Sequence, residues 1–167
     1  MELYLEYIYT EKVGLSRAPE GGGGGALEPS LLGPSIMEQG SGEDMSEATR
    51  LFHNAARLYI LADQLLDADC KDYVVDAVMK CADTHHSIPG RGVIRMIWKG
   101  TPAGAPMRRL ILDYWTYGTD ARQFVGHEDR FPEEFKDELL ANFYARGTVG
   151  EMGRMPTFED RLEYHHH

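Results

Sequence analysis

Apolar residues recur at three- and four-residue steps through the middle of the chain, and this spacing predicts two helices joined as a hairpin. The first is expected from Asp44, which can cap it in a capping box with Glu47, to about Leu66. The second is expected from Cys70 to Ala82. The apolar positions of the first helix nearly encircle its second half, from Leu58 to Leu66, so we expect it to be the most buried helix.

Three further helices are predicted downstream of this hairpin. A cap and first turn at residues 87–89 precede Val93, Ile94, Ile97 and Trp98. Pro106 opens the clearest amphipathic pattern in the chain, which Gly118 ends. Residues 131–134 have proline and carboxylates suited to a helix start, and Arg146-Gly147 ends that helix. No alternating β-branched run is present, so the predicted fold class is all-α with almost no strand.

The segments outside this helical domain, residues 44–147, differ in pattern. Residues 1–13 have Leu3, Tyr7 and Ile8 at helical spacing and predict a short helix. Residues 14–43 contain five consecutive glycines and three prolines, which predicts a long disordered insert. Residues 148–167 show no sustained period and are expected to form a flexible tail, whose last three histidines resemble the remnant of an affinity tag.

The charge of the chain restricts the classes of partner. It carries 17 Lys and Arg against 27 Asp and Glu, a formal net charge of -10, which disfavours binding to nucleic acid or an acidic membrane. Neither a signal peptide nor a membrane span is expected. Cys70 and Cys81 are predicted to lie roughly 16 Å apart on one helix, beyond disulfide reach. Two reduced thiols suit the cytoplasm or nucleus.

Several blocks of sequence resemble fungal BTB/POZ-domain proteins. Residues 3–10 are similar to the late BTB helix that ends in Tyr-Thr-Gly, with Glu11 in place of the glycine. Residues 58–64 and 71–77 resemble the helical pair that closes the domain. Residues 93–98, 101–110 and 113–115 resemble the helical extension after it, and residues 131–135 that extension's last helix.

This resemblance implies a protein-interaction adaptor without catalytic activity. Its front half, which family members use to dimerise, would precede Met1, so the chain is expected to be a truncated or shortened form. The surface by which some relatives bind a cullin ubiquitin-ligase scaffold would lie largely in that missing part. A nuclear, transcription-associated regulator is the alternative within the same family.

The histidines provide the other alternative, a small metal-binding protein. His85 and His86 follow Cys81 and could ligate zinc, but a structural site needs about four ligands, so we expect solvated histidines there. His127-Glu128-Asp129 lacks a nucleophile or a metalloprotease pattern and is interpreted as an exposed loop. No catalytic residue, metal or other cofactor is therefore predicted.

The candidate interaction residues are apolar, because large open apolar patches promote association. Trp98 and Trp115 could form an interface hot spot, although their helical spacing favours core packing. Loss of the BTB front half would uncover apolar surface on the first helix and on the stretch Leu58 to Leu66, through which we expect a protein partner or self-association. The full set of candidates is Leu3, Tyr7, Ile8, Leu58, Ile60, Leu61, Trp98 and Trp115. Arg108 and Arg109 oppose the macrodipole of their helix start, so carboxylate partners are expected nearby.

Overall fold

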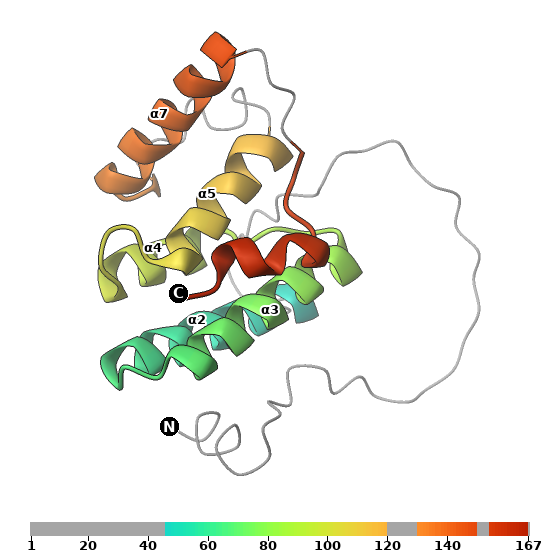
Figure 1. Ribbon diagram of the computed structural model, residues 1–167, viewed down its shortest axis with the longest axis vertical. Helices are drawn as coiled ribbons and strands as arrows, with labels where there is room; N and C mark the ends of the chain where they lie inside the picture. Colours follow the sequence, from blue (N-terminus) through green and yellow to red (C-terminus); the bar gives the residue numbers. More distant parts are fainter. Residues whose placement is uncertain (1–45, 120–129, 150–153, 167) are drawn as a thin grey trace, which may run out of the picture.

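The computed structural model describes residues 46–119, 130–149 and 154–166, without the side chains of 146–149. Every regular element in these ranges is helical and none is a strand, which confirms the predicted all-α fold. The predicted N-terminal helix and the Gly/Pro-rich insert lie outside the described residues. Two antiparallel helices form one layer, α4 (Arg91–Gly100) and α5 (Pro106–Gly118) lie over them, and α7 (Glu133–Val149) lies beyond α5 (Figure 1).

The predicted hairpin is present, with bounds that differ at the connection. Helix α2 spans Glu47–Gln64 and α3 spans Ala68–His85. Ser46 caps α2 by accepting a 3.2 Å hydrogen bond from the Thr49 amide, while the predicted cap, Asp44, lies outside the described residues. Asp67 caps α3 by accepting a 2.9 Å bond from the Cys70 amide. This cap starts α3 two residues earlier than its apolar pattern predicts.

All three predicted downstream helices are present, and the bounds of one agree with the prediction at both ends. Helix α5 spans Pro106–Gly118, the predicted bounds, because proline suits the first helical position and glycine the end. Helix α4 spans Arg91–Gly100, so it begins after the Ser-Ile-Pro segment that was expected to contain its first turn. Helix α7 spans Glu133–Val149 and continues past Arg146 and Gly147, where its end was predicted.

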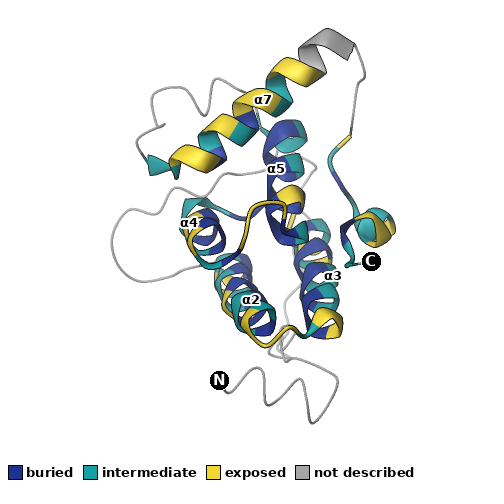
Figure 2. Ribbon diagram, turned by 60° about the vertical axis from the view of Figure 1, so that its left-hand side comes forward, coloured by how far each residue is buried: buried dark blue, intermediate teal, exposed yellow. Residues whose placement is uncertain are grey.

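The core lies where α2, α3, α4 and α5 face one another, and α7 covers it with one side only (Figure 2). Its fully buried large side chains include Tyr59, Met79, Ile94, Leu110, Tyr114 and Phe135. The helices approach closely at Gly100, where a Cβ would lie 2.6 Å from Cδ1 of Ile60. Glycine at the end of α4 thus lets the side chain of Ile60 pack directly against the backbone.

The segment expected to be a flexible tail is partly structured, which corrects that prediction for residues 154–166. It contains a 3-10 helix, η2 (Phe158–Tyr164), lying along α3 and α5 (Figure 1). The buried Tyr164 donates a 2.9 Å hydrogen bond to Asp113, and the amide of Phe158 donates one of 2.9 Å to Asp83. His165 and His166, expected to be a tag remnant, contact carboxylates of α3, at 2.9 Å from Asp76 and 2.8 Å from Asp72. Local periodicity misses η2 because its partners lie far away in the sequence.

Tyr164→Phe is expected to lower the free energy of unfolding by about 2 kcal/mol at pH 7, because a charge-assisted hydrogen bond is lost. Burial raises the pKa of Asp113, and the Tyr164 hydrogen bond opposes that rise. The stability that a raised carboxyl pKa contributes is complete below the ordinary value of about 3.9 and is lost as pH rises through the folded-state pKa. Without Tyr164 the folded-state pKa rises further, so the variant's deficit should shrink as pH falls from 7 towards 4.

Urea unfolding across this pH range measures that deficit. Tyr144→Phe is the matched control, because Tyr144 is 77% exposed and its loss of a hydroxyl should cost under about 0.5 kcal/mol at any pH. An equal deficit for Tyr164→Phe at pH 4 and pH 7 would contradict the role given to ionised Asp113.

Candidate functional site

Two of the predicted interaction residues, Trp98 and Trp115, are core residues. They are only 5% and 2% exposed, so neither is available to a protein partner in this fold. Their helical spacing favoured this core packing. Their rings pack edge-on against Phe135 of α7, with centroid distances of 4.9 Å and 5.9 Å. The indole nitrogen of Trp115 donates a 2.9 Å hydrogen bond to the Pro89 carbonyl, which satisfies it inside the core.

The apolar stretch Leu58 to Leu66 divides between core and surface. Leu58 is 2% exposed and faces the core, so its selection as a surface candidate is wrong. Ile60 and Leu61 are half-buried. The other candidates, Leu3, Tyr7 and Ile8, lie outside the described residues. What the structure leaves exposed is the end of the stretch, Leu65 and Leu66, which the individually named candidates do not include.

Leu65 and Leu66 form the turn between α2 and α3 and are the candidate functional site, termed here the hairpin tip. Leu65 is 52% exposed and Leu66 is 85% exposed, the largest value among the exposed large apolar residues of the described ranges. The turn is yellow, and so exposed, in the view coloured by burial (Figure 2). Burying a leucine side chain gains about 2 kcal/mol, and here that gain is not used within the fold.

The backbone of the hairpin tip is held in one conformation. The amide of Asp67 donates to the Ala62 carbonyl at 2.9 Å, and that of Leu65 donates to the Leu61 carbonyl at 3.0 Å. These bonds place Leu66 in the left-handed region, with φ of 57°. Glycine is the usual residue at this position of a helix end, and a leucine there costs about 1 kcal/mol. The fold therefore keeps an exposed leucine where glycine would be more stable.

Carboxylates border the hairpin tip. Asp69 is exposed, and Asp67 caps α3. Asp63 forms an ion pair with Lys71, with 3.0 Å between Oδ1 and Nζ, and the Lys71 side chain is 10% exposed. Three carboxylates against one ammonium leave the tip with a negative local charge. The arrangement resembles a binding hot spot in outline, an apolar contact surrounded by polar groups.

Sequence reasoning misses the hairpin tip because it assigns Leu65 and Leu66 to the apolar stripe of a longer helix. One local signal was present. Asp67, with Cys70 three positions later, is a good N-cap, and a cap for α3 at Asp67 forces the chain to leave α2 before it. The two preceding leucines must then occupy a turn, where a buried position is rare.

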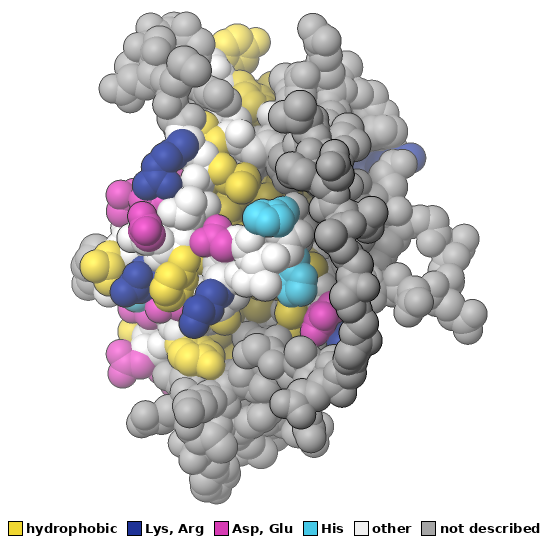
Figure 3. Space-filling model, turned by 90° about the vertical axis from the view of Figure 1, so that its right-hand side faces the viewer, with side chains coloured by type: hydrophobic (Ala, Val, Ile, Leu, Met, Phe, Trp, Pro, Cys, Tyr) yellow, Lys and Arg dark blue, Asp and Glu magenta, His cyan; other side chains and the backbone are white. Residues whose placement is uncertain are grey.

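The predicted metal ligands do not converge in the described part of the chain. His85 and His86 are exposed at the end of the hairpin away from its turn. Figure 3 shows histidine side chains, in cyan, on one face of the molecule. Within residues 46–119, 130–149 and 154–166, no group of three or more His, Cys, Asp or Glu side chains could hold a metal ion. His127 lies outside the described residues.

Both cysteines are free thiols, as predicted from their separation on one helix. Burial, with a smaller contribution from Asp67, raises the pKa of Cys70 to about 12. Burial and Glu47 raise the pKa of Cys81 to about 11. Neither sulfur is therefore ionised at neutral pH, and neither is an activated nucleophile.

Among the helices of the described ranges, none combines the length and apolar character needed to cross a bilayer. In the comparisons with known proteins, no family model, no curated protein and no solved structure matches this chain. The resemblance to BTB/POZ proteins thus stays a prediction from the quoted sequence blocks.

Proposed function

We propose that this protein is a protein-interaction module that binds a partner through the hairpin tip. The observation that carries the proposal is Leu66, a side chain 85% exposed on a backbone with φ of 57°. A largely exposed apolar residue held at such a conformation suggests a role outside the fold. The BTB/POZ resemblance, a family of adaptors, supports the same class of function.

The chemistry of the tip favours a particular kind of partner. Leu65 and Leu66 require an apolar pocket, and the bordering Asp63, Asp67 and Asp69 favour Lys or Arg around that pocket. A second copy of this chain, with its net charge of -10, complements the tip poorly. The proposed partner is therefore a different, basic protein, and its binding should weaken as salt concentration rises.

Leu66→Gly is expected to abolish partner binding while it stabilises the protein. Glycine relieves the left-handed strain, a gain of about 1 kcal/mol in the free energy of unfolding. The same change removes a central apolar contact, which should weaken binding at least about tenfold. Urea unfolding measures the first effect, and quantitative affinity capture from a native extract at low and high salt measures the second.

Leu140→Asn is the matched control for this experiment, because Leu140 is 43% exposed but lies on α7, away from the hairpin tip. It should retain every basic protein that the unmodified chain captures. Identical capture by the unmodified chain and by Leu66→Gly would refute the proposal. Sedimentation across a concentration series tests the alternative occupant, since self-association lost in Leu66→Gly would identify a second copy.

A further inference from the structure

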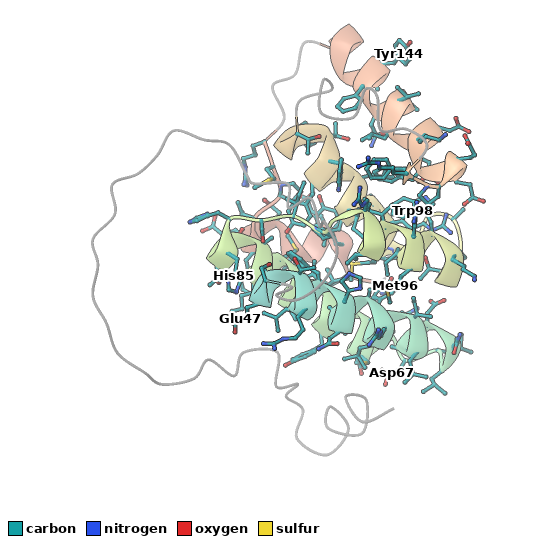
Figure 4. The ribbon with its side chains drawn as sticks, turned by 180° about the vertical axis from the view of Figure 1, so that it is seen from behind. Glu47, Asp67, His85, Met96, Trp98 and Tyr144 are labelled. Atoms are coloured by element: carbon teal, nitrogen blue, oxygen red, sulfur yellow. The ribbon has the colours of Figure 1, made fainter. Side chains whose placement is uncertain are left out.

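A cavity of about 420 Å³ lies at the opposite end of the hairpin from the tip, where α2 begins, α3 ends and α4 begins. Glu47 and His85 mark this end, and Asp67 marks the tip (Figure 4). The volume is within the range of small-molecule sites, roughly 300–1,000 Å³. Four described helices contribute to its wall, namely α2, α3, α4 and, through Trp115, α5, so its shape depends on the fold as a whole.

The ionisable groups that line this cavity are mostly cationic or imidazole. They are His53 of α2, His85 and His86 at the end of α3, Arg91 and Arg95 of α4, and one carboxylate, Glu47. Arg91 and Arg95 are four positions apart and so project from the same side of their helix. In a chain with a net charge of -10, this is a local reversal of sign. The reversal favours an anion over a cation or a neutral ligand.

Two details indicate that the cavity is built around polar chemistry. A Cβ at Gly92 would lie 2.9 Å from Cε1 of His53, so glycine here leaves room for the imidazole against α4. Ser87 also lines the cavity, and its Oγ is buried without a hydrogen-bond partner among the described residues.

Part of the remaining wall is apolar. It is lined by Phe52, Ile88, Val93 and Trp115, and all four belong to the buried core cluster. Helix α4 begins beside them without a side-chain cap, so its first amides add donors at a positive dipole end. The arrangement combines an anion-attracting rim with an aromatic floor.

We propose that this cavity binds a small organic phosphate, with the phosphoryl group towards Arg91, Arg95 and the histidines and an apolar or aromatic body against the apolar part of the wall. Arginine presents paired donors that match phosphate oxygens. The site is independent of the proposed protein interaction, because the hairpin tip and the cavity lie at opposite ends of α2 and α3.

Titration with phenyl phosphate, up to about 10 mM and followed by NMR of the histidine rings, tests this site. Burial and then Arg57 lower the pKa of His53, and a bound dianion should raise it. Arg91→Gln and Arg95→Gln should each weaken binding about tenfold, and Gly92→Ala should weaken it by displacing His53. Arg109→Gln is the matched control: Arg109 is an exposed arginine of α5 that does not line the cavity, so neither the affinity nor the pKa of His53 should change.

Two further probes separate the sources of the anion. Inorganic phosphate should bind more weakly than phenyl phosphate, because it leaves the aromatic floor unused, and equal affinities would refute the organic ligand. Vesicles containing phosphatidic acid should not sediment the protein. Vesicle binding without a response to phenyl phosphate would assign the cationic groups to a lipid surface and overturn the proposal, as would an unchanged His53 pKa in folded protein.

Discussion

Phe135→Ala is expected to lower the free energy of unfolding by about 4 kcal/mol, the usual cost of removing a fully buried phenyl ring. Phe135 is 0% exposed and, with Leu139, joins α7 to the core. Its ring lies 4.9 Å from that of Trp98, 5.9 Å from that of Trp115 and 5.4 Å from that of Phe131. The substitution leaves a cavity bordered by both indoles and removes three aromatic contacts.

Denaturant unfolding followed by tryptophan fluorescence measures this loss, because both tryptophans of the chain contact Phe135. Leu140→Ala provides the control on the same helix. Leu140 is 43% exposed, and its truncation should cost under about 1 kcal/mol. If Phe135→Ala cost no more than Leu140→Ala, Trp98 and Trp115 would not be core residues held by α7, and their selection as interaction residues would regain support.

The parts of the fold that local signals determine are the parts predicted from the sequence. Helix α5 has both predicted bounds because Pro106 and Gly118 act within a turn of the chain. Such local signals do not show which residues pack against Trp98 and Trp115. Their spacing identifies one face of a helix but not the partner that covers it, and Phe135 follows Trp115 only after the segment at residues 120–129.

Longer-range contacts explain the remaining differences. Helix η2 is held by hydrogen bonds that join residues 51 and 75 positions apart in the chain, which no short window contains. The apolar pattern of the sequence does not distinguish Leu66 from a core leucine. Its exposure follows from the N-cap of α3 at Asp67, which places Leu66 in a turn. Residues of four helices line the cavity, so no sequence motif brings His53, His85 and Arg91 together.

Arg108 shows how a sequence-level conflict is resolved by tertiary structure. A cation near the start of α5 opposes that helix's dipole, and carboxylate partners were expected. Glu134 of α7 is one, 3.0 Å from Nη1, and Glu138 lies 4.0 Å away. The shortest bonds go to the end of α4 instead, since Nη2 donates to the carbonyls of Trp98 at 2.6 Å and Thr101 at 2.5 Å. Arg108 is thus favourably placed at the C-terminus of α4.

Arg108→Ala is consequently expected to lower the free energy of unfolding by about 3 kcal/mol. Arg108 is 4% exposed, so its removal leaves the Trp98 and Thr101 carbonyls buried without their donor. The substitution also removes a cation 5.3 Å from the Trp98 ring. It removes the bonds by which the guanidinium of α5 joins α4 and α7. Thermal unfolding should show a fall in Tm of roughly 10 °C or more for a domain of this size.

The adjacent residue supplies the control. Arg109 is exposed and lies 5.0 Å from the ring of Tyr164, so Arg109→Ala removes the same charge and a comparable number of atoms at the cost of under about 1 kcal/mol. Because Glu134 is largely exposed, Glu134→Gln should also lower the free energy of unfolding only slightly. That result would assign the effect of Arg108→Ala to the α4 carbonyls and not to the ion pair. A Glu134→Gln deficit equal to that of Arg108→Ala would reverse this assignment. Equal deficits for Arg108→Ala and Arg109→Ala would instead attribute the loss to charge alone.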